Sequence, residues 1–191
     1  LLINMPIAFA LGIAATTTLL FNDTLPINSI VTRAFVGVDS FTLLAIPFFI
    51  IAGELMNACG ITERIVAFAR SLVGFIRGGL AHVNILTSLF FSEISGTATS
   101  DAAAIGSVMI PQMKKRGYSV AFAAAVTATS ATMAIIVPPS LNLILYAYVS
   151  STSIAELFAA GILPGFVVCF ALMFTAYVIS VRQGYPIEGK F

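Results

Sequence analysis

Long apolar blocks alternate along this chain with short polar clusters. The first block, residues 1–21, is long enough to cross the roughly 30 Å hydrocarbon layer of a membrane, and it stops at a turn-forming cluster, residues 22–26. The second block, residues 41–59, is also of spanning length, but Pro47 and Glu54 within it predict a kinked helix or one that faces protein interior. Both blocks predict membrane-spanning helices.

A different pattern follows in residues 61–76, where apolar side chains recur at helical spacing. The apolar stripe consists of Ile61, Ile65, Phe68, Leu72 and Phe75. Arg64, Arg70 and Arg77 fall off this stripe. Such a pattern is typical of an amphipathic helix that lies in the membrane interface, and the glycine pair at 78–79 is expected to end it.

Two shorter apolar segments come next, residues 80–92 and 98–113, and each falls short of a comfortable span. Between them lies the small polar sequence Ser95-Gly96-Thr97. Two short limbs joined by such a tip predict a re-entrant helical hairpin, because non-helical backbone at membrane depth is tolerated only where protein or water covers it.

A longer apolar stretch, residues 118–149, is interrupted near its middle by Pro138 and Pro139. Proline has no N–H and a fixed φ, so the helical ladder must break there and leave carbonyl groups free before the prolines. The stretch therefore predicts a discontinuous helix. Residues 154–181 predict a final span.

The basic residues agree with this layout. When the hairpin enters and leaves on one side, nearly all of them fall on a single face, and only Arg33 falls on the other. By the positive-inside rule the first face is cytoplasmic. It carries Arg64, Arg70, Arg77, Lys114, Lys115, Arg116, Arg182 and Lys190.

Composition indicates that the chain is a membrane domain almost throughout. Of its 191 residues, 59% are apolar and only 9% are charged, which excludes an ordinary water-soluble fold. The net charge of +1 gives no electrostatic footprint for nucleic acid, and we expect none as a partner. Cys59 and Cys169 lie in apolar blocks without metal or redox spacing. We see no signal peptide and interpret the first residues as the interior of a longer protein.

A hairpin tip and a broken helix are the two devices from which secondary transporters build a binding site at the membrane midplane. The candidate ligands are the hydroxyls of Ser95, Thr97 and Thr99 and the carbonyls before Pro138 and Pro139. These hard oxygens, with no required carboxylate, suit a weakly held monovalent ion such as Na⁺. The alternative is that the small residues only allow close helix packing.

Other polar residues near the tip leave more than one interpretation open. Asp101 in the second limb either caps the N-terminus of that limb or contacts the ion directly. Glu93 is expected to face a water-filled cavity, and Asn84 is a candidate for lining the site. Glu54 has no partner that the sequence identifies.

The pair Ser95-Gly96 inside a membrane also invites comparison with an intramembrane serine protease. The single histidine, His82, lies on the same limb about 20 Å away at 1.5 Å per helical residue, too far to act as the base. We therefore predict that the chain is not an enzyme.

Ordered motifs along nearly the whole chain point to one family. They are Gly53-Glu54-Leu55-Met56, Arg77-Gly78-Gly79-Leu80-Ala81-His82-Val83-Asn84, Ile94-Ser95-Gly96-Thr97-Ala98, Asp101-Ala102-Ala103-Ala104-Ile105-Gly106-Ser107, Ile110-Pro111-Gln112-Met113, Arg116-Gly117-Tyr118 and Val137-Pro138-Pro139-Ser140. In these motifs and their spacing the chain resembles the large membrane subunit of tripartite ATP-independent periplasmic (TRAP) transporters, the DctM-like family. The resemblance implies a sodium-driven, elevator-type uptake system for organic acids such as C4-dicarboxylates or sialic acid. It also implies a periplasmic substrate-binding protein and a small membrane subunit as partners.

The resemblance further implies that this chain is the first of two inverted repeats, so that the C-terminal half of the large subunit is missing. In the family, the hairpin tip and backbone oxygens of the broken helix form a sodium site, which corresponds here to Ser95, Gly96, Thr97, Ala134, Val137 and Pro139. Support for the site or its cavity is expected from Asn84, Thr99, Asp101, Pro138 and Ser140. Thr97 stands where the family commonly has a serine. Ala134-Ile135 stands where it commonly has Gly-Pro, so the helix is expected to unwind over fewer residues.

The expected fold is an all-α, multi-span integral membrane domain of the bacterial inner membrane, one inverted repeat of an elevator-type secondary transporter. Residues 1–79 are expected to form scaffold-type spans with the interfacial helix, and residues 80–191 the transport-type region. The latter comprises the re-entrant hairpin (80–113), the broken helix (118–149) and a span (154–181). Na⁺ is the expected coupling ion, with no organic cofactor, and an organic anion and the lipid bilayer complete the partners. The functional alternative is a membrane scaffold or assembly fragment without transport activity of its own.

Overall fold

The computed structural model describes residues 5–22 and 28–187, and at Asn22, Phe41, Thr42, Asn57 and Ser95 it describes the backbone alone. Nearly all of the described residues lie in helices, and no strand occurs among them. The prediction of an all-α fold is therefore confirmed. The chain divides into two compact units, Leu1–Leu44 and Ala45–Phe191, which are described separately below.

The first unit contains α1 (Ile7–Asn22) and α2 (Asn28–Val38), and α3 (Phe41–Ala58) begins at its end. The first apolar block forms a helix as predicted, but its 16 described residues make it shorter than a full span. The predicted turn at 22–26 lies largely outside the described residues. The sequence did not predict α2, because it is only 11 residues long and carries Arg33 in its middle.

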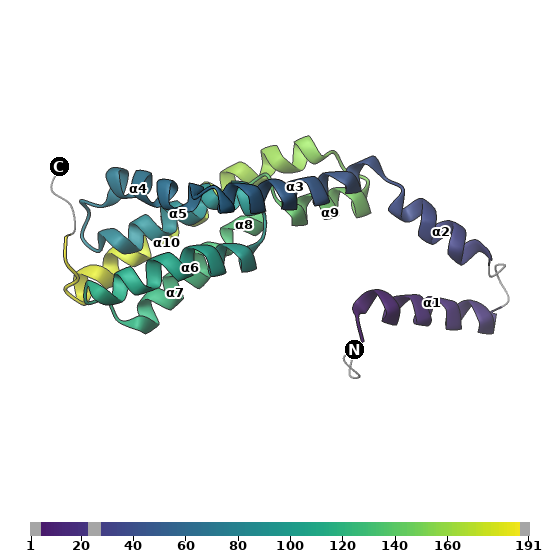
Figure 1. Cartoon of the computed structure of the whole chain (residues 1–191), viewed down its shortest axis with the longest axis horizontal. Coiled ribbons are helices and arrows are strands. Elements are labelled where there is room, and N and C mark those ends of the chain that lie inside the picture. Colours follow the sequence, from purple (N-terminus) through teal and green to yellow (C-terminus); the bar gives the residue numbers. More distant parts are fainter. Residues whose placement is uncertain (1–4, 23–27, 188–191) are drawn as a thin grey trace. The chain divides into compact units, whose positions relative to one another are not determined.

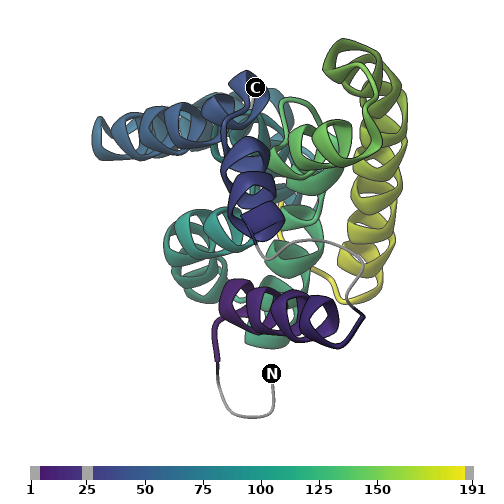
Figure 2. The ribbon, with the colours of Figure 1, turned by 90° about the vertical axis from the view of Figure 1, so that its right-hand side faces the viewer.

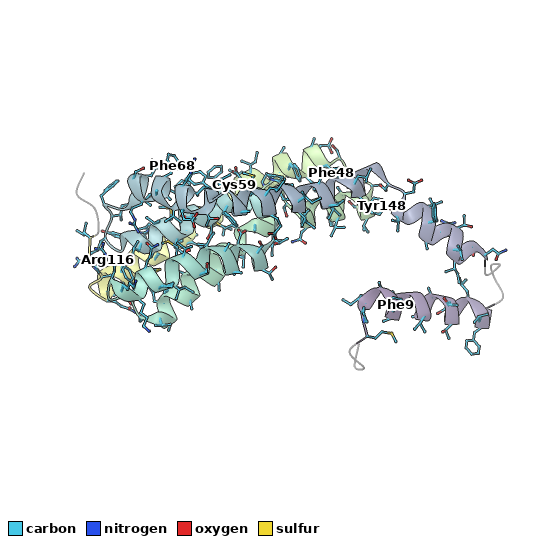
Figure 3. The ribbon with its side chains drawn as sticks, viewed as in Figure 1. Phe9, Phe48, Cys59, Phe68, Arg116 and Tyr148 are labelled. Carbon is cyan, nitrogen blue, oxygen red and sulfur yellow. The ribbon has the colours of Figure 1, made fainter. Side chains whose placement is uncertain are left out.

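The second unit begins with most of α3 and continues with α4 (Ile61–Val73). The predicted helix at 41–59 is confirmed, with Pro47 inside it. The amphipathic helix is also present. The side that α4 buries carries Thr62, Val66 and Ala69, and Ile61 and Ile65 of the apolar stripe are half-buried. Phe68 of that stripe stays 54% exposed and projects outward (Figure 3). The helix ends at Val73, before the predicted glycine pair.

The predicted hairpin consists of α5 (Gly79–Ser95) and α6 (Ala98–Lys115). The chain reverses at Gly96, whose φ of 59° is in the left-handed region, and at Thr97, which is extended. The limbs have 17 and 18 residues, longer than the apolar segments, because the helices continue through flanking polar residues. Each is about 26 Å long at 1.5 Å per residue, so the expected shortness of the limbs was wrong. Re-entry into the membrane stays a prediction.

The predicted discontinuous helix is confirmed. It consists of α7 (Val120–Ala131), the short α8 (Met133–Ile136) and α9 (Leu141–Ser150), and residues 137–140 between α8 and α9 are not helical. The last helix, α10 (Ile154–Arg182), has 29 residues. By length and composition, two segments of the described chain are suited to cross a membrane, Val120–Ser150 and Ile154–Arg182. A third is added if Asn28–Val38 and Leu43–Met56 form one bent span.

The first hairpin limb, α5, is the centre of the second unit. It lies between α4 on one side and α6 and α7 on the other (Figure 1), and it also contacts α8 and α10. Figure 2 shows the green-to-yellow α10 running beside α9. The fully buried side chains of the core include Leu80, Val83, Ile85, Met109, Met113 and Met133. Packing against α5 therefore fixes where the hairpin tip lies relative to the broken helix.

The basic end of this unit is tied together by the segment that follows α10. Tyr185 is only 6% exposed, and its ring stacks on Tyr118 at a centroid distance of 4.4 Å. Its carbonyl accepts a hydrogen bond from Arg77 Nε at 3.3 Å, and the N–H of Gly78 donates to the carbonyl of Pro186 at 3.1 Å. The base of the hairpin, the turn after α6 and the end of α10 are thus held at one point.

Replacing this anchor is expected to destabilise the protein. We expect Tyr185→Ala to lower the free energy of unfolding by about 3 kcal/mol, as for other buried aromatic side chains. The same change at Tyr146, which is 60% exposed on α9, is expected to have little effect. Thermal unfolding of the full-length protein in detergent measures both effects. Equal losses of stability in the two variants would contradict the anchoring role of Tyr185.

Candidate functional site at the hairpin tip

The hairpin tip and the break in the discontinuous helix lie against one another. A methyl group added at Gly96 would lie 3.3 Å from the backbone nitrogen of Leu141, the first residue of α9, and 2.7 Å from Cε1 of Phe49 on α3. Glycine is therefore needed at the tip both for its positive φ and for the close approach. The two regions that the sequence selected separately are neighbours in space.

The break exposes backbone oxygen atoms because of its two prolines. Pro138 and Pro139 cannot donate the hydrogen bonds that the carbonyls of Ala134 and Ile135 would receive in a continuous helix. The hydroxyl of Ser140, which is fully buried, donates instead to the carbonyl of Ile135 at 3.0 Å. Ser140 thus closes part of the break, while the carbonyl of Ala134 is left without its helical donor.

Two glycines of α10 let that helix pack directly onto the break. A methyl group at Gly161 would lie 2.5 Å from the carbonyl oxygen of Ile136, and one at Gly165 would lie 2.6 Å from Cγ2 of Val137. Sequence reasoning missed this pair. The signal for it was present, because small residues four apart on an apolar helix are typical of close helix packing in membranes.

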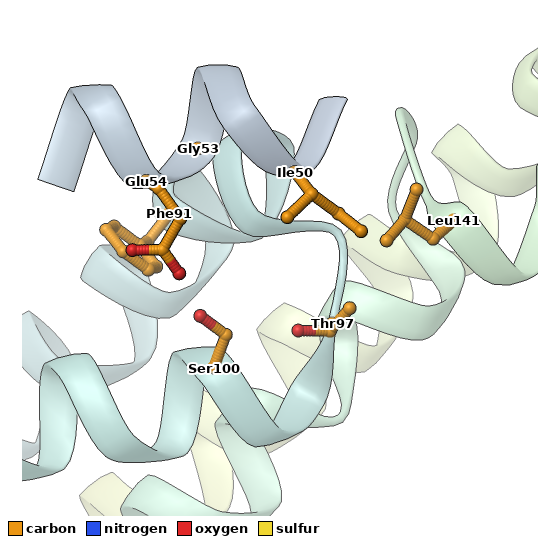
Figure 4. A pocket seen from close by; sticks show the side chains of 7 residues that line it. All are labelled: Ile50, Gly53, Glu54, Phe91, Thr97, Ser100 and Leu141. Carbon is orange, nitrogen blue, oxygen red and sulfur yellow. The ribbon is translucent and has the colours of Figure 1, made fainter. Parts of the chain in front are cut away.

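A cavity of about 200 Å³ opens on the α3 side of the tip. Its lining comprises Ile50, Gly53, Glu54, Phe91, Thr97, Ser100 and Leu141. Figure 4 shows the carboxylate of Glu54 pointing from α3 into this cavity, with the hydroxyls of Thr97 and Ser100 on the opposite wall. Glu54, which had no partner in the sequence, therefore faces the tip, and Ser100 joins the site although the sequence did not single it out.

A second cavity, of about 260 Å³, lies on the α10 side of the same region. Leu89 and Glu93 of α5, Val137 and Pro138 of the break, and Ile162 and Phe166 of α10 line it. Glu93 thus lies at a cavity, and its solvation by water in that cavity stays a prediction. Val137 and Pro138, both candidates from the sequence, are brought to this wall.

The remaining candidates divide into buried and exposed residues. Asn84 is fully buried and its Nδ2 donates to Thr127 Oγ1 at 2.7 Å, so it joins α5 to α7. Asp101 is fully buried in the first turn of α6, whereas Thr99 is exposed. Ser95 ends α5, and its side chain lies outside the described part of the structure.

A second polar contact joins α5 to α7, one turn closer to the tip. The hydroxyls of Ser88 and Ser130 share a hydrogen bond of 2.8 Å, and both side chains are fully buried. A double-mutant cycle with Ser88→Ala and Ser130→Ala is expected to give a coupling of about 0.6 kcal/mol, the average for such pairs in membrane helices. Thermal unfolding of the four full-length variants measures it, and simple additivity would contradict a shared bond.

The donors gathered at the tip are hydroxyls, carbonyls and single carboxylates. Within residues 5–22 and 28–187, no three His, Cys, Asp or Glu side chains group together as a transition-metal site requires. Oxygen donors of low charge suit a hard monovalent cation. His82 is buried near the base of α5 and stacks on Tyr177, far along the helix from the tip, so it supplies no base there.

Comparison with known proteins gives one family. The chain matches the tripartite ATP-independent periplasmic transporter, DctM component, over residues 1–191. It is 46% identical over 95% of its length to the sialic acid TRAP transporter large permease protein SiaM of Vibrio cholerae. It is 34% identical over 97% of its length to the C4-dicarboxylate TRAP transporter large permease protein DctM of Rhodobacter capsulatus, and 38% over 98% to the 2,3-diketo-L-gulonate TRAP transporter large permease protein YiaN of Escherichia coli. The chain covers 43%, 46% and 44% of these relatives, or slightly under half of each.

Proposed function

The chain belongs to the DctM family of tripartite ATP-independent periplasmic transporters, and on that basis we propose that it forms the first half of a sodium-driven large permease subunit in the bacterial inner membrane. The subunit imports a small organic acid with a periplasmic substrate-binding protein and a small membrane subunit. In this proposal α5 and α6 form a re-entrant hairpin, and the second unit moves as the transport-type part of an elevator. The second repeat is supplied by the remainder of the permease.

One observation carries the proposal: the hairpin tip meets the break of the discontinuous helix at Gly96 and Leu141. Each region leaves backbone groups outside the helical ladder, and at membrane depth such groups require protein, water or a ligand as partner. Secondary transporters use this combination to bind ions and solutes at the midplane.

The proposed sodium site consists of the tip residues Ser95, Gly96 and Thr97 and the backbone oxygens of Ala134, Val137 and Pro139. The carbonyl of Ala134, which lacks its helical donor, and the extended Thr97 support this choice. Neutral oxygens hold Na⁺ weakly, as a coupling ion requires, since it must be released on the other side of the membrane.

The relatives support an acidic solute. Their names specify sialic acid, C4-dicarboxylates and 2,3-diketo-L-gulonate, all of which carry at least one carboxylate. We propose a small organic acid as substrate, because a negatively charged acidic group is the feature that these solutes share.

Uptake of labelled organic acids into proteoliposomes tests this function. The liposomes contain the full-length permease with its small subunit, and uptake is measured with and without the binding protein and an inward sodium gradient. We expect uptake to require both, and Ser95→Ala to abolish it while the complex still assembles. Uptake indifferent to sodium and to the binding protein would overturn the proposal and leave a scaffold role.

A further inference from the structure

Exposed basic side chains gather at the end of the second unit that lies away from the hairpin tip. Three segments meet there, residues 70–78, 112–119 and 179–187, and none of them contains an Asp or Glu. The basic cluster consists of Arg70, Arg77, Lys114, Lys115, Arg116 and Arg182. Like charges gathered in this way repel one another, and an anion bound among them relieves the repulsion.

Carboxylates of the described residues do not compensate the cluster. None of its six members forms an ion pair with an Asp or Glu of residues 5–22 and 28–187. The carboxylate of α4, Glu63, lies in the first turn of that helix, about 10 Å along the axis from Arg70. The cluster therefore has room for an anion that the described chain does not supply.

The positive-inside rule and the helix dipoles account for the sign of these charges, but not for the way in which two of them are held. Nη2 of Arg70 donates to Oε1 of Gln112 at 2.6 Å, across 42 positions of sequence. Nε of Arg77 donates to the carbonyl of Tyr185 at 3.3 Å, across 108 positions. Each bond uses one of the five N–H donors of a guanidinium group, so both groups are fixed in place with donors left for a ligand.

Gln112 brings Arg70 to the basic end of α6. Lys115 and Arg116 follow Gln112 by three and four residues, so they lie on the side of α6 that holds Arg70. Figure 3 shows Arg116 at this end of the unit. Arginine binds phosphate oxygens with two parallel N–H groups, and lysine adds a compact positive charge. A phosphate group between α4 and α6 therefore meets three cations from two helices.

Apolar side chains beside the cluster favour a phospholipid over a soluble anion. Leu72 and Phe75 are exposed and lie between Arg70 and Arg77 in the chain, and the exposed Val181 precedes Arg182. In the proposed orientation this end lies at the cytoplasmic leaflet, whose anionic lipids attract basic segments. A phospholipid offers a phosphate to the cations and acyl chains to the apolar neighbours. Free phosphate and an acidic protein segment offer only the negative charge.

We propose that the basic cluster binds the phosphate of an anionic phospholipid, with Arg70, Lys115 and Arg116 as its ligands. The proposal takes the cytoplasmic position of this end from the proposed function, but it requires neither sodium coupling nor a particular solute. The bound lipid stabilises the contact between α4 and α6 at Gln112. It gives the second unit a lipid site at the end away from the proposed sodium site.

The test uses the full-length permease with its small subunit in detergent, and phosphatidylglycerol as the probe. Native mass spectrometry measures binding, and thermal unfolding measures stabilisation. Phosphatidylcholine is the zwitterionic control and inorganic phosphate the soluble control, and we expect phosphatidylglycerol to bind and stabilise more than either. In the double variant Arg70→Gln/Arg116→Gln we expect the dissociation constant for phosphatidylglycerol to rise ~30-fold, equivalent to about 1 kcal/mol for each arginine.

Two matched double variants control for the loss of charge. Arg33→Gln/Arg64→Gln removes two exposed arginines outside the cluster and should leave the dissociation constant unchanged. Arg70→Lys/Arg116→Lys keeps both charges and should retain most of the binding.

The outcomes separate this inference from the proposed function. Equal affinity for phosphatidylglycerol in Arg70→Gln/Arg116→Gln and in the wild type would overturn the lipid site alone. Equal stabilisation by inorganic phosphate and by phosphatidylglycerol would identify a soluble anion as the ligand and overturn the lipid assignment. A wild type that binds phosphatidylglycerol selectively but shows no sodium-dependent uptake would overturn the proposed function and leave the lipid site intact.

Discussion

Gly161→Ala is expected to abolish uptake by the full-length permease. In an ordinary helix interior this change stabilises by about 1 kcal/mol, because alanine has the higher helix propensity. In α10 the added methyl group would lie 2.5 Å from the carbonyl oxygen of Ile136, a backbone atom that cannot turn aside. Either α10 or the break must move. The proposed sodium site between the hairpin tip and the break is then lost. Uptake in proteoliposomes and thermal unfolding of the purified protein measure the two consequences.

Two matched changes separate the contact from general effects of alanine. Gly12→Ala on α1 introduces the same methyl group where no described atom lies within 4 Å, and it should leave stability and uptake unchanged. Gly165→Ala meets a side-chain atom, Cγ2 of Val137, at 2.6 Å, so the additional change Val137→Ala should restore most of its loss. Normal uptake by Gly161→Ala would show that α10 does not hold the break in place.

Thr97→Val is the second change for which we expect a large effect. Valine has the shape of threonine and favours the extended backbone that residue 97 adopts, so the reversal of the chain should persist. What is lost is the hydroxyl that faces the cavity at the tip (Figure 4). A polar interaction with a charged partner, here that of the Thr97 hydroxyl with the sodium ion, contributes about 1.5–3 kcal/mol. We therefore expect the half-saturating sodium concentration for uptake to rise ~10–100-fold.

The control for this change is Thr175→Val on α10. The hydroxyl of Thr175 donates only to the carbonyl of Ala171 in its own helix, and the residue is exposed. The substitution should leave the sodium titration unchanged. If Thr97→Val also keeps the wild-type titration, the hydroxyl of Thr97 is not a ligand and the proposed sodium site is wrong at this residue.

The sequence by itself determined the features that depend on local chemistry. The apolar blocks predicted α1, α3 and α10, because burial in lipid requires an unbroken run of apolar side chains. Gly96 predicted the reversal between α5 and α6, and the prolines at 138 and 139 predicted the break before α9, because φ and the missing N–H are properties of single residues. These predictions did not require knowledge of any neighbour in space.

Only the tertiary structure decided which surfaces meet. The periodicity identified the apolar stripe of α4 but not the neighbouring residues Val66 and Ala69, which are the ones buried in this helix that packs against α5. Glu54 and Ser100 face each other across 46 positions of sequence, and Gly161 touches the carbonyl of Ile136 across 25, in each case because packing of helices brings distant residues together. Helical periodicity specifies the faces of one helix but not the rotation of that helix against its neighbour, which depends on how the side chains of both interlock.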